Sequence, residues 1–396
     1  MILSGPNEHV IEVDDEYSIN KLKKKGYKEA TKTEVDKYRQ RVEEAMAKKD
    51  LSTADNGVFY QTVQSSPNGY GMSRDIIKSE LFAKGFKLEE YFAKQKIGLL
   101  YSYPNAVTQM RTDVRLIMTM FESDKIPEDW PEYLKMADEV IVPSKWCADV
   151  FAKSGVKATV VPLGYNDKVF TYQDRPVPVK DDKPFTFIHY QSFNQRKGFS
   201  EVFKAFNEEF KHNENVRLIL KTTEKKAPIP IMPSEYPNIE VVTDKMPEED
   251  LLKLLRQCNC MVYPSRGEGF GITPLEAMAT GMPAIVPNAH GISEYFNSNY
   301  MLEVKVSGSC PGLYRSAKGH DVGKMVICDV EDLKKQMRHA FNNQAEMKEL
   351  GKSASEYVKR FTYEKTAEAL ADILKKWQKA EIVRRTESKF LQVEPA

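Results

Sequence analysis

Short apolar runs rich in β-branched and aromatic residues recur from residue 57 onward, with amphipathic segments of helical length between them. They form two sets, separated by the proline-rich, charged stretch 171–184. The first set comprises 57–63, 97–103, 114–120, 139–144 and 158–164, and the second comprises 185–192, 216–222, 239–244, 260–265 and 283–288. Because the runs do not alternate apolar and polar positions, they predict parallel strands that helices cover on both faces. The pattern therefore predicts an α/β protein with two doubly wound, Rossmann-like parallel-sheet domains facing a central cleft.

The ends of the chain have a different pattern. Residues 1–50 are polar and rich in Lys and Glu, which indicates an appendage of strand and helix on the first domain. Residues 353–385 have helical periodicity and are expected to close the second domain and then pack back toward the first. The predicted units are the appendage 1–50, a first Rossmann-like domain 51–175, a second Rossmann-like domain 176–375 and a returning helix 376–396.

Length and charge narrow the class of protein. A chain of 396 residues exceeds one ordinary core, and its net charge of +1 provides no global basic field for indiscriminate nucleic-acid binding. No apolar run approaches the roughly 20 residues that span a bilayer, and residues 1–10 lack a signal-peptide pattern. The five cysteines have no metal-site spacing and are expected to be reduced and structural, so we expect a cytoplasmic protein.

The stretch PSRGEGFGITPLEAMATGMPAIVP, residues 264–287, joins a strand to a short helix through a glycine-rich turn. Thr273 is a predicted N-cap, Pro274 suits the first helical position and Glu276 would complete a capping box. Gly281 is predicted to end the helix. A helix that starts over such a turn offers its amides and its dipole to an anion, and a pyrophosphate fits best.

Gly269 and Gly271 would let the backbone approach that anion, because neither carries a Cβ atom. A plainer interpretation remains open from these residues alone. In that interpretation Glu276 only caps its helix, and Glu268 is a solvated loop carboxylate.

The same stretch closely resembles the E-x7-E signature of the retaining glycosyltransferases of family GT4, which have the two-domain GT-B fold. The resemblance implies that Glu276 binds the ribose hydroxyls of a nucleotide sugar and that Glu268 lies near the transferred sugar. Carboxylates suit sugar diols because each accepts two hydrogen bonds. The donor-binding segment implied by the resemblance is Gly269, Phe270, Gly271, Ile272 and Thr273.

Arg196 and Lys197 follow the first strand of the second set, at a predicted turn into a helix. In isolation they could be a solvated pair of cations. The stretch resembles the RKG element of the same family, whose basic residues hold the donor phosphates as the leaving group gains charge. Glu268, Arg196 and Lys197 are therefore the catalytic candidates.

Four residues are candidates for the acceptor or the cleft. Gly69 and Gly71 resemble the glycine loop of the family's N-terminal domain, and Glu122 follows a buried strand at its carboxyl end. His290 could approach the sugar from the second domain, since residues 10–188 contain no histidine where many family members have one. For Gly69 and Gly71 a plain turn, and for Glu122 a surface carboxylate, are the competing interpretations.

The resemblance implies a retaining transfer in which no protein nucleophile attacks the sugar. No tightly bound cofactor or metal is expected; the donor is a nucleoside-diphosphate sugar, with a UDP-sugar expected first and a GDP-sugar second. The acceptor would be a hydroxyl of a glycan, a lipid-linked sugar or a small molecule. Basic residues in 1–50 and in the apparent insertion 304–328 also allow DNA with hydroxymethylated bases. The same residues are compatible with a GT-B nucleotide-sugar epimerase and with a non-catalytic module that binds nucleotides.

Overall fold

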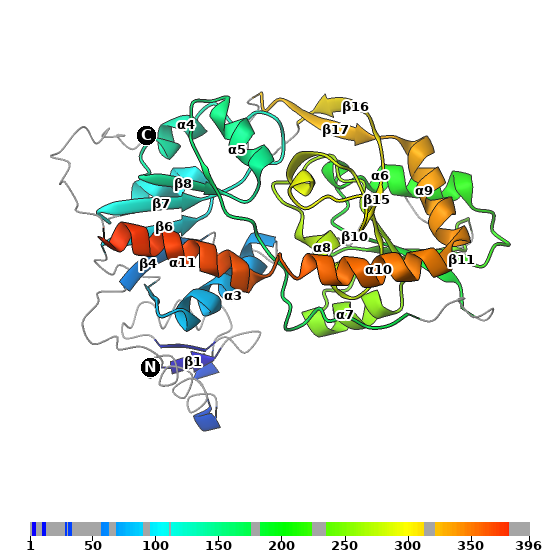
Figure 1. Ribbon diagram of the computed structural model, residues 1–396, viewed down its shortest axis with the longest axis horizontal. Coiled ribbons are helices and arrows are strands. Elements are labelled where there is room, and N and C mark those ends of the chain that lie inside the picture. Colours follow the sequence, from blue (N-terminus) through cyan, green and yellow to red (C-terminus); the bar gives the residue numbers. More distant parts are fainter. Residues whose placement is uncertain are drawn as a thin grey trace.

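A computed structural model describes residues 2–4, 10–12, 28–29, 31–33, 57–62, 69–89, 96–110, 112–175, 183–223, 235–312 and 321–379. Two six-stranded parallel sheets lie side by side, each with helices packed around it (Figure 1). The predicted α/β architecture with two Rossmann-like domains is therefore confirmed. In the described part of the chain no helix is both long enough and apolar enough to cross a bilayer.

The first sheet has the strand order β5-β4-β6-β7-β8-β9. Its strands are β4 (Gly57–Thr62), β5 (Lys87–Glu89), β6 (Ile97–Tyr101), β7 (Val114–Met118), β8 (Glu139–Val142) and β9 (Thr159–Val160). The helices α3 (Gly69–Ala83), α4 (Trp130–Leu134) and α5 (Lys145–Ala152) connect them. Central strands such as β6 are buried at every position, which explains the continuous apolar runs in the sequence.

The second sheet has the order β12-β11-β10-β13-β14-β15. Its strands are β10 (Phe185–Tyr190), β11 (Val216–Lys221), β12 (Ile239–Val242), β13 (Cys260–Val262), β14 (Ala284–Val286) and β15 (Leu302–Glu303). Its helices are α6 (Phe199–Glu209), α7 (Glu248–Arg256), α8 (Ile272–Ala279), α9 (Val330–Asn342) and α10 (Gln344–Val358). Each of the ten predicted runs contains a strand, and each strand is shorter than its run, most of all β9, β13 and β14.

One prediction about the periphery needs correction. Within 304–328, residues 306–311 and 324–328 form an antiparallel hairpin, β16 (Val306–Pro311) with β17 (Lys324–Cys328), where the sequence indicated only an inserted loop. Tyr314, Arg315, Lys318 and His320, which supported a basic loop, lie outside the described residues. Of the predicted appendage, the structure describes the short strands β1 (Ile2–Ser4), β2 (Val10–Glu12) and β3 (Lys28–Glu29), which form one antiparallel sheet.

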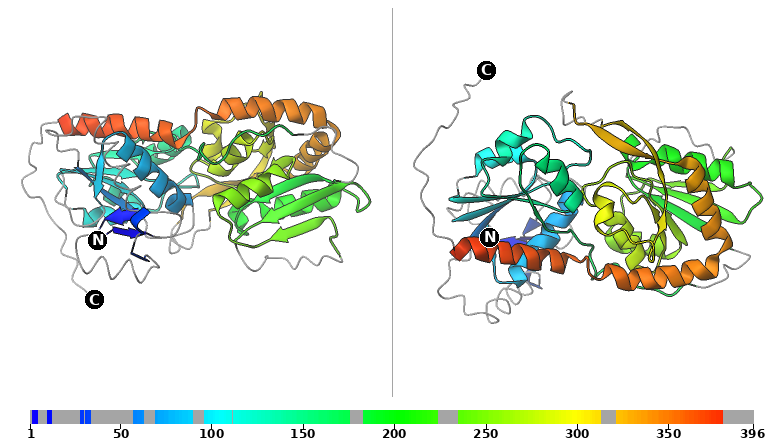
Figure 2. Two further views of the ribbon diagram at one scale, coloured as in Figure 1. Left: turned by 90° about the horizontal axis from the view of Figure 1, so that it is seen from below. Right: turned by 45° about the horizontal axis from the view of Figure 1, so that its top comes forward.

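The return of the chain to the first domain begins earlier than residue 376. The predicted helical region 353–385 is interrupted after α10, and α11 (Tyr363–Lys379) then runs along the first domain beside α3 (Figures 1 and 2). Trp377 Nε1 donates to Glu139 Oε2 at 2.6 Å, and Lys96 Nζ donates to the Gln378 carbonyl at 2.9 Å. Residues 380–396 lie outside the described residues.

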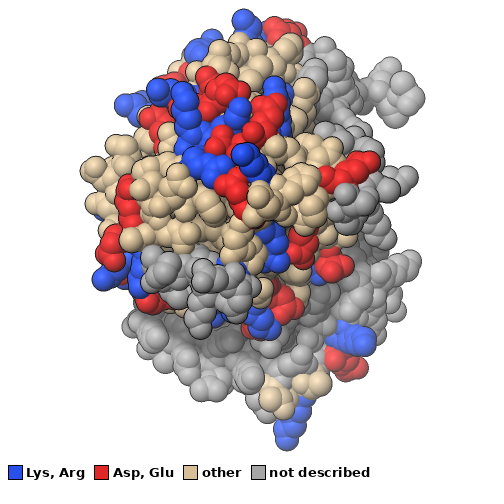
Figure 3. All heavy atoms as spheres, turned by 90° about the vertical axis from the view of Figure 1, so that its right-hand side faces the viewer, with Lys and Arg blue, Asp and Glu red and all other residues tan. Residues whose placement is uncertain are grey.

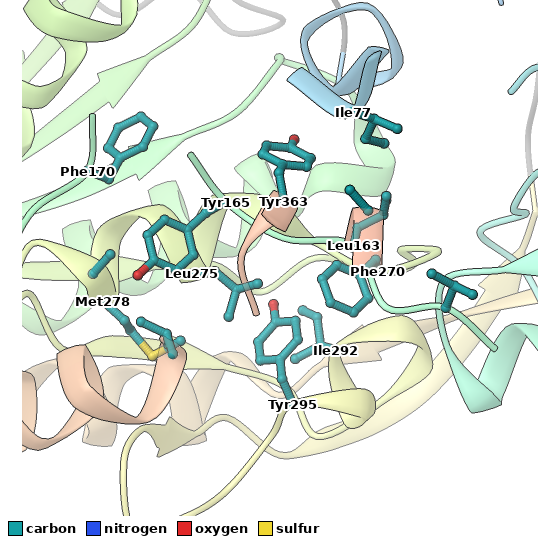
Figure 4. Packing of buried hydrophobic residues seen from close by; sticks show 14 of the residues in the cluster. Ile77, Leu163, Tyr165, Phe170, Phe270, Leu275, Met278, Ile292, Tyr295 and Tyr363 are labelled. Atoms are coloured by element: carbon teal, nitrogen blue, oxygen red, sulfur yellow. The ribbon is translucent and has the colours of Figure 1, made fainter. Parts of the chain in front are cut away.

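Both domains contribute to one apolar cluster where they meet. Ile77 and Leu163 from the first domain lie in the same cluster as Phe270, Leu275 and Tyr295 from the second (Figure 4). All five side chains are buried. The junction is therefore packed like a domain interior, which fixes the position of the two domains relative to each other.

Arg175 anchors the chain where it enters the second domain. Its buried guanidinium donates through Nη1 to the carbonyl groups of Leu255 and Cys258, and through Nη2 to Thr280 Oγ1 at 2.9 Å. Burial lowers the pKa of Arg175 to about 10, so the group stays charged at neutral pH. One side chain thus holds the ends of α7 and α8 together.

We expect Arg175→Ala to lower the free energy of unfolding by about 2 kcal/mol or more, because it leaves buried carbonyl groups without a donor. Lys253→Ala is the matched control, since this lysine is exposed on α7 and pairs only with Asp250 one turn away. Urea unfolding of both variants provides the measurement. Equal losses in the two variants would contradict the anchoring role.

Candidate functional site

The strands β10 and β13 are parallel neighbours, so the residues that follow them meet at one edge of the second sheet. After β10 comes the short 3₁₀ helix Gln195–Lys197, and after β13 comes the loop that contains Glu268. The backbone joins them, because the Arg266 amide donates to the Arg196 carbonyl at 2.7 Å. The topology therefore brings both cationic candidates to the first glutamate.

Glu268 accepts hydrogen bonds from four side chains. Oε1 accepts from Lys197 Nζ at 2.7 Å, from Ser265 Oγ at 2.7 Å and from Tyr263 OH at 2.9 Å. Oε2 accepts from Arg196 Nη1 at 3.1 Å. The residue is only 6% exposed, so the interpretation of Glu268 as a solvated loop carboxylate is wrong.

The charges of this group are interdependent. Burial alone would raise the pKa of Glu268, but Lys197 and Arg196 outweigh burial and hold that pKa well below its usual range. Burial and the neighbouring Arg196 lower the pKa of Lys197, and the contact with Glu268 opposes them. The carboxylate is thus ionised at neutral pH and holds two cations side by side.

Helix α8 begins two residues earlier than the sequence indicated. Gly271 is its N-cap, with φ at 88°, and Ile272 is the first helical residue. Thr273 is therefore not the N-cap, and its Oγ1 instead accepts from Gln191 Nε2 at 3.4 Å. Because Thr273 already lies inside the helix, Glu276 forms no capping box with it. Gly281 follows the last helical turn with φ at 84°, which confirms the predicted helix end.

The segment Gly269–Thr273 divides into two parts. Gly271, Ile272 and Thr273 lie at the start of α8, where amides lack partners within the helix. Phe270 is a core residue, 1% exposed. Gly269 packs on the first domain, where a Cβ atom would come within 2.7 Å of the Met120 side chain. The absence of a side chain at Gly269 therefore allows contact between the domains, a role that the sequence did not indicate.

Glu276 is about as buried as Glu268 but differs from it in hydrogen-bond partners and in the direction of its pKa shift. Its side chain is 8% exposed and has no hydrogen-bond partner among the described residues. Burial raises the pKa of Glu276 to about 8, and the nearby Glu248 adds to this effect. Glu248 is itself held by Asn166, whose Nδ2 donates to Oε2 at 2.9 Å. Glu276 is thus a buried acceptor that no protein group in the described chain satisfies.

The first domain brings Glu122 to the same place. Glu122 follows β7, and its Oε1 lies 3.8 Å from Arg196 Nη2. Burial raises the pKa of Glu122, Arg196 opposes this, and the charge of Glu268 adds to it. The backbones are equally close, since a Cβ atom on Gly267 would lie 2.0 Å from the Glu122 carbonyl oxygen. Glu122 therefore lies where the two domains meet, beside both cations.

The remaining candidates are placed as follows. Gly69 and Gly71 belong to the first turn of α3, so the predicted tight glycine loop is wrong at these positions.

His290 lies under the Glu268 loop, where its Nε2–H donates to the Ser265 carbonyl at 2.9 Å. Burial lowers the pKa of His290 to about 4, so the ring is neutral at pH 7. Its backbone has φ at 43°, an uncommon value for a residue with a side chain.

Sequence reasoning missed Tyr263, Ser265 and Ser144. Tyr263 and Ser265 hold Glu268, and Ser144 Oγ donates to the Gly269 carbonyl at 2.8 Å from the first domain. Tyr263 and Ser265 directly follow a buried strand, and this position could have identified them as candidate site residues. Ser144 precedes a predicted helix and is indeed the N-cap of α5. The neighbouring sequence does not indicate that it also contacts the second domain.

Residues 171–309 match the sequence profile of the family described as glycosyl transferases group 1. A putative glycosyltransferase, number 45, of a Sulfolobus islandicus filamentous virus is 23% identical over 61% of this chain and 66% of its own length. The alpha-1,3/1,6-mannosyltransferase ALG2 of Dictyostelium discoideum is 23% identical over 77% of this chain and 76% of its own length.

Solved structures share the fold. Anabaena HepE in complex with UDP-glucose superposes with a TM-score of 0.57 at 13% identity, covering 81% of this chain and 99% of HepE. WaaG, a glycosyltransferase involved in lipopolysaccharide biosynthesis, superposes with a TM-score of 0.53 at 13% identity. The match covers 80% of this chain and 99% of the WaaG chain. The fold is GT-B, and together the profile match and the relatives indicate a glycosyltransferase.

We expect Glu268→Gln to lower the free energy of unfolding by about 3 kcal/mol, because two largely buried cations lose their counter-charge. Glu240→Gln provides a matched control, since the Glu240–Arg217 pair is partly exposed and should contribute less than about 1 kcal/mol. Chemical denaturation measures both. A loss at Glu268 as small as that at Glu240 would show that the cations do not depend on this carboxylate.

Glu276 should make stability depend on pH. Its raised pKa means that the native state keeps a proton which the unfolded chain loses above about 4.5, so stability falls as pH rises toward about 8. The slope is at most about 1.4 kcal/mol per pH unit. Glu276→Gln should flatten this part of the profile. His189 and His290 titrate in both proteins, so their opposite contributions cancel in the comparison. Parallel profiles would refute the raised pKa.

Proposed function

We propose that this protein is a retaining hexosyltransferase of the GT4 type, which moves a sugar from a nucleoside-diphosphate sugar to a hydroxyl acceptor. One observation carries the proposal: Arg196 and Lys197 converge on Glu268 at the sheet edge from which α8 starts, and the unsatisfied Glu276 lies one turn along that helix. Cations and a helix N-terminus together suit a diphosphate.

The order of these groups gives the orientation of the donor. The two phosphates lie between the Arg196–Lys197 pair and the start of α8 at Gly271–Thr273. The ribose hydroxyls donate to Glu276, which has no partner of its own in the described chain. The sugar then extends toward Glu268, and the acceptor enters from the side of Glu122 in the first domain. His290 supports the Glu268 loop from below through Ser265.

The reaction breaks the bond between the anomeric carbon and the β-phosphate oxygen, and the acceptor oxygen bonds to that carbon from the same face. The acceptor proton passes to the departing phosphate. Lys197 and Arg196 stabilise the charge that develops on this phosphate, together with the dipole of α8. UDP-sugars are the first donors to test, in line with the UDP-glucose bound to HepE, and GDP-sugars are the second.

The face of the second domain that Figure 3 shows adds no support for a DNA acceptor. On the face of the second domain shown in Figure 3, acidic and basic side chains are interspersed, and pairs such as Arg338–Glu209 and Lys334–Glu208 neutralise one another. A polyanion favours a surface of one sign. A glycan, a lipid-linked sugar or a small hydroxyl compound is therefore the proposed acceptor, and hydroxymethylated duplex DNA belongs in the test panel.

The function is tested by following release of nucleoside diphosphate from individual UDP- and GDP-sugars, with each class of acceptor and without any. We expect release that one acceptor class accelerates, with the anomeric configuration of the donor kept in the product. Conversion of the sugar without an acceptor would instead indicate an epimerase. Donor binding without release under every condition would indicate a binding module.

Two substitutions test the assigned roles. Lys197→Ala should reduce turnover by at least ~10²-fold through lost stabilisation of the leaving phosphate, whereas Glu276→Ala should mainly weaken donor binding. Lys204→Ala, an exposed lysine on α6 of the same domain, is the control and should change neither quantity. Unchanged kinetics and donor affinity in both site variants would contradict the assignment.

A further inference from the structure

The hairpin β16–β17 belongs to the second domain by sequence but reaches the first domain. It rises above the second sheet and points toward α5 and α4 (Figure 1). Residues 321–324, which lead into β17, contact residues 123–125, which directly follow Glu122. The contact therefore lies next to the carboxylate that faces Arg196.

Three backbone-directed hydrogen bonds form this contact. Ser123 Oγ donates to the Val322 carbonyl at 2.6 Å, and the Lys324 amide donates to Asp124 Oδ1 at 2.6 Å. The Asp124 amide returns a bond to the Lys324 carbonyl at 3.1 Å. An exposed ion pair, Lys125 Nζ to Asp321 Oδ2 at 3.0 Å, lies at the rim. One backbone bond and two side-chain bonds thus hold residues 322–324 against residues 123–124.

Val322 makes the contact apolar as well. Its side chain is 2% exposed and belongs to a buried cluster whose other members come from the first domain, including Phe121, Ile126 and Trp130. A residue of the second domain therefore completes a core of the first. This is the pattern of a fixed connection between two bodies, since a chance surface contact would leave Val322 accessible.

The other side of the same strand contacts the Glu268 loop. The Val326 amide donates to the Arg266 carbonyl at 2.9 Å, and a Cβ atom on Gly267 would lie 3.4 Å from Met325 Cγ. Residues 322–326 therefore bridge the segment after Glu122 and the segment before Glu268. Both carboxylates that flank Arg196 are tied to one strand.

We propose that Ser123, Asp124 and Val322 are positioning residues of the transfer reaction: through the docked hairpin they hold Glu122 against Arg196 and so complete the acceptor side of the site. This inference rests on the proposed function. The donor groups Arg196, Lys197 and Glu276 all belong to the second domain. The hairpin contact that supports them, Val326 to Arg266, does not involve Ser123 or Asp124 and should survive when the hairpin leaves the first domain. Loss of docking should therefore reduce transfer while donor affinity is kept.

Asp124→Ala and Asp124→Asn form the decisive pair. Asparagine keeps the Oδ1 acceptor for the Lys324 amide, whereas alanine removes it. We expect Asp124→Ala to lower kcat for transfer at least ~10-fold with donor Kd changed less than ~2-fold, and Asp124→Asn to restore most of kcat. Equal kcat in the two variants, or a loss of donor affinity that matches the loss of kcat, would overturn the proposal.

A reversible covalent link provides the second test. A Cβ atom on Gly312 would lie 3.2 Å from Ser123 Cβ, slightly shorter than the usual disulfide spacing, so S123C with G312C should cross-link after a small shift. The pair is placed in an Asp124→Ala, Cys310→Ser background, which removes the nearest competing thiol. Oxidation should restore kcat and reduction should abolish the gain. No gain in a fully cross-linked sample would overturn the positioning role.

Hydrogen exchange separates this inference from the proposed function, because it needs no turnover. Asp124→Ala should speed exchange of the amides of 122–125 and 322–326 at least ~10-fold over Asp124→Asn. Unchanged exchange would show that the hairpin is not held by these bonds and would overturn the proposal. If the wild-type protein transfers no sugar but exchange behaves as expected, the proposed function fails and the docking stands.

Discussion

The contact between Glu268 and the pair Arg196–Lys197 is the interaction on which the site depends. Two cations on neighbouring residues repel one another, and partial burial makes that repulsion costly. One carboxylate, fixed by Tyr263 and Ser265 through hydrogen bonds of 2.9 and 2.7 Å, offsets it. The protein thereby keeps both cations at the edge of the sheet, beside the start of α8. Under the proposed function, this arrangement would offer a diphosphate partners that are already in place.

The same loop determines how closely the domains approach. Gly267 and Gly269 pack against Glu122 and Met120 with no room for a Cβ atom, and Ser144 reaches across to the Gly269 carbonyl. The bridging strand of the hairpin lies along this junction, and the shared apolar cluster around Phe270 closes it from the other side. The geometry of the cations is thus coupled to the contact between the domains. Any opening of the cleft should move Glu122 away from Arg196 while Glu268 stays with its cations.

The sequence predicted the parts that follow from sheet topology. Apolar runs without alternation indicated parallel strands, and parallel strands place Arg196, Lys197 and Glu268 at a common edge. The sequence did not predict features that depend on a backbone dihedral angle or on a contact with a residue distant in the chain. Thr273 has the chemistry of an N-cap, but Gly271 takes the left-handed conformation and starts the helix first. The opposite pKa shifts of Glu268 and Glu276, eight residues apart, come from long-range neighbours, and so does the docking of Val322 into a core far away in sequence.

The most direct test of the central claim is a crystal structure of the protein with a nucleoside-diphosphate sugar. The account predicts that the phosphates lie within hydrogen-bond distance of Lys197 Nζ, Arg196 and the amides of Ile272 and Thr273, with the ribose hydroxyls on Glu276. Phosphates bound elsewhere, while Arg196 and Lys197 remain engaged only with Glu268, would contradict it.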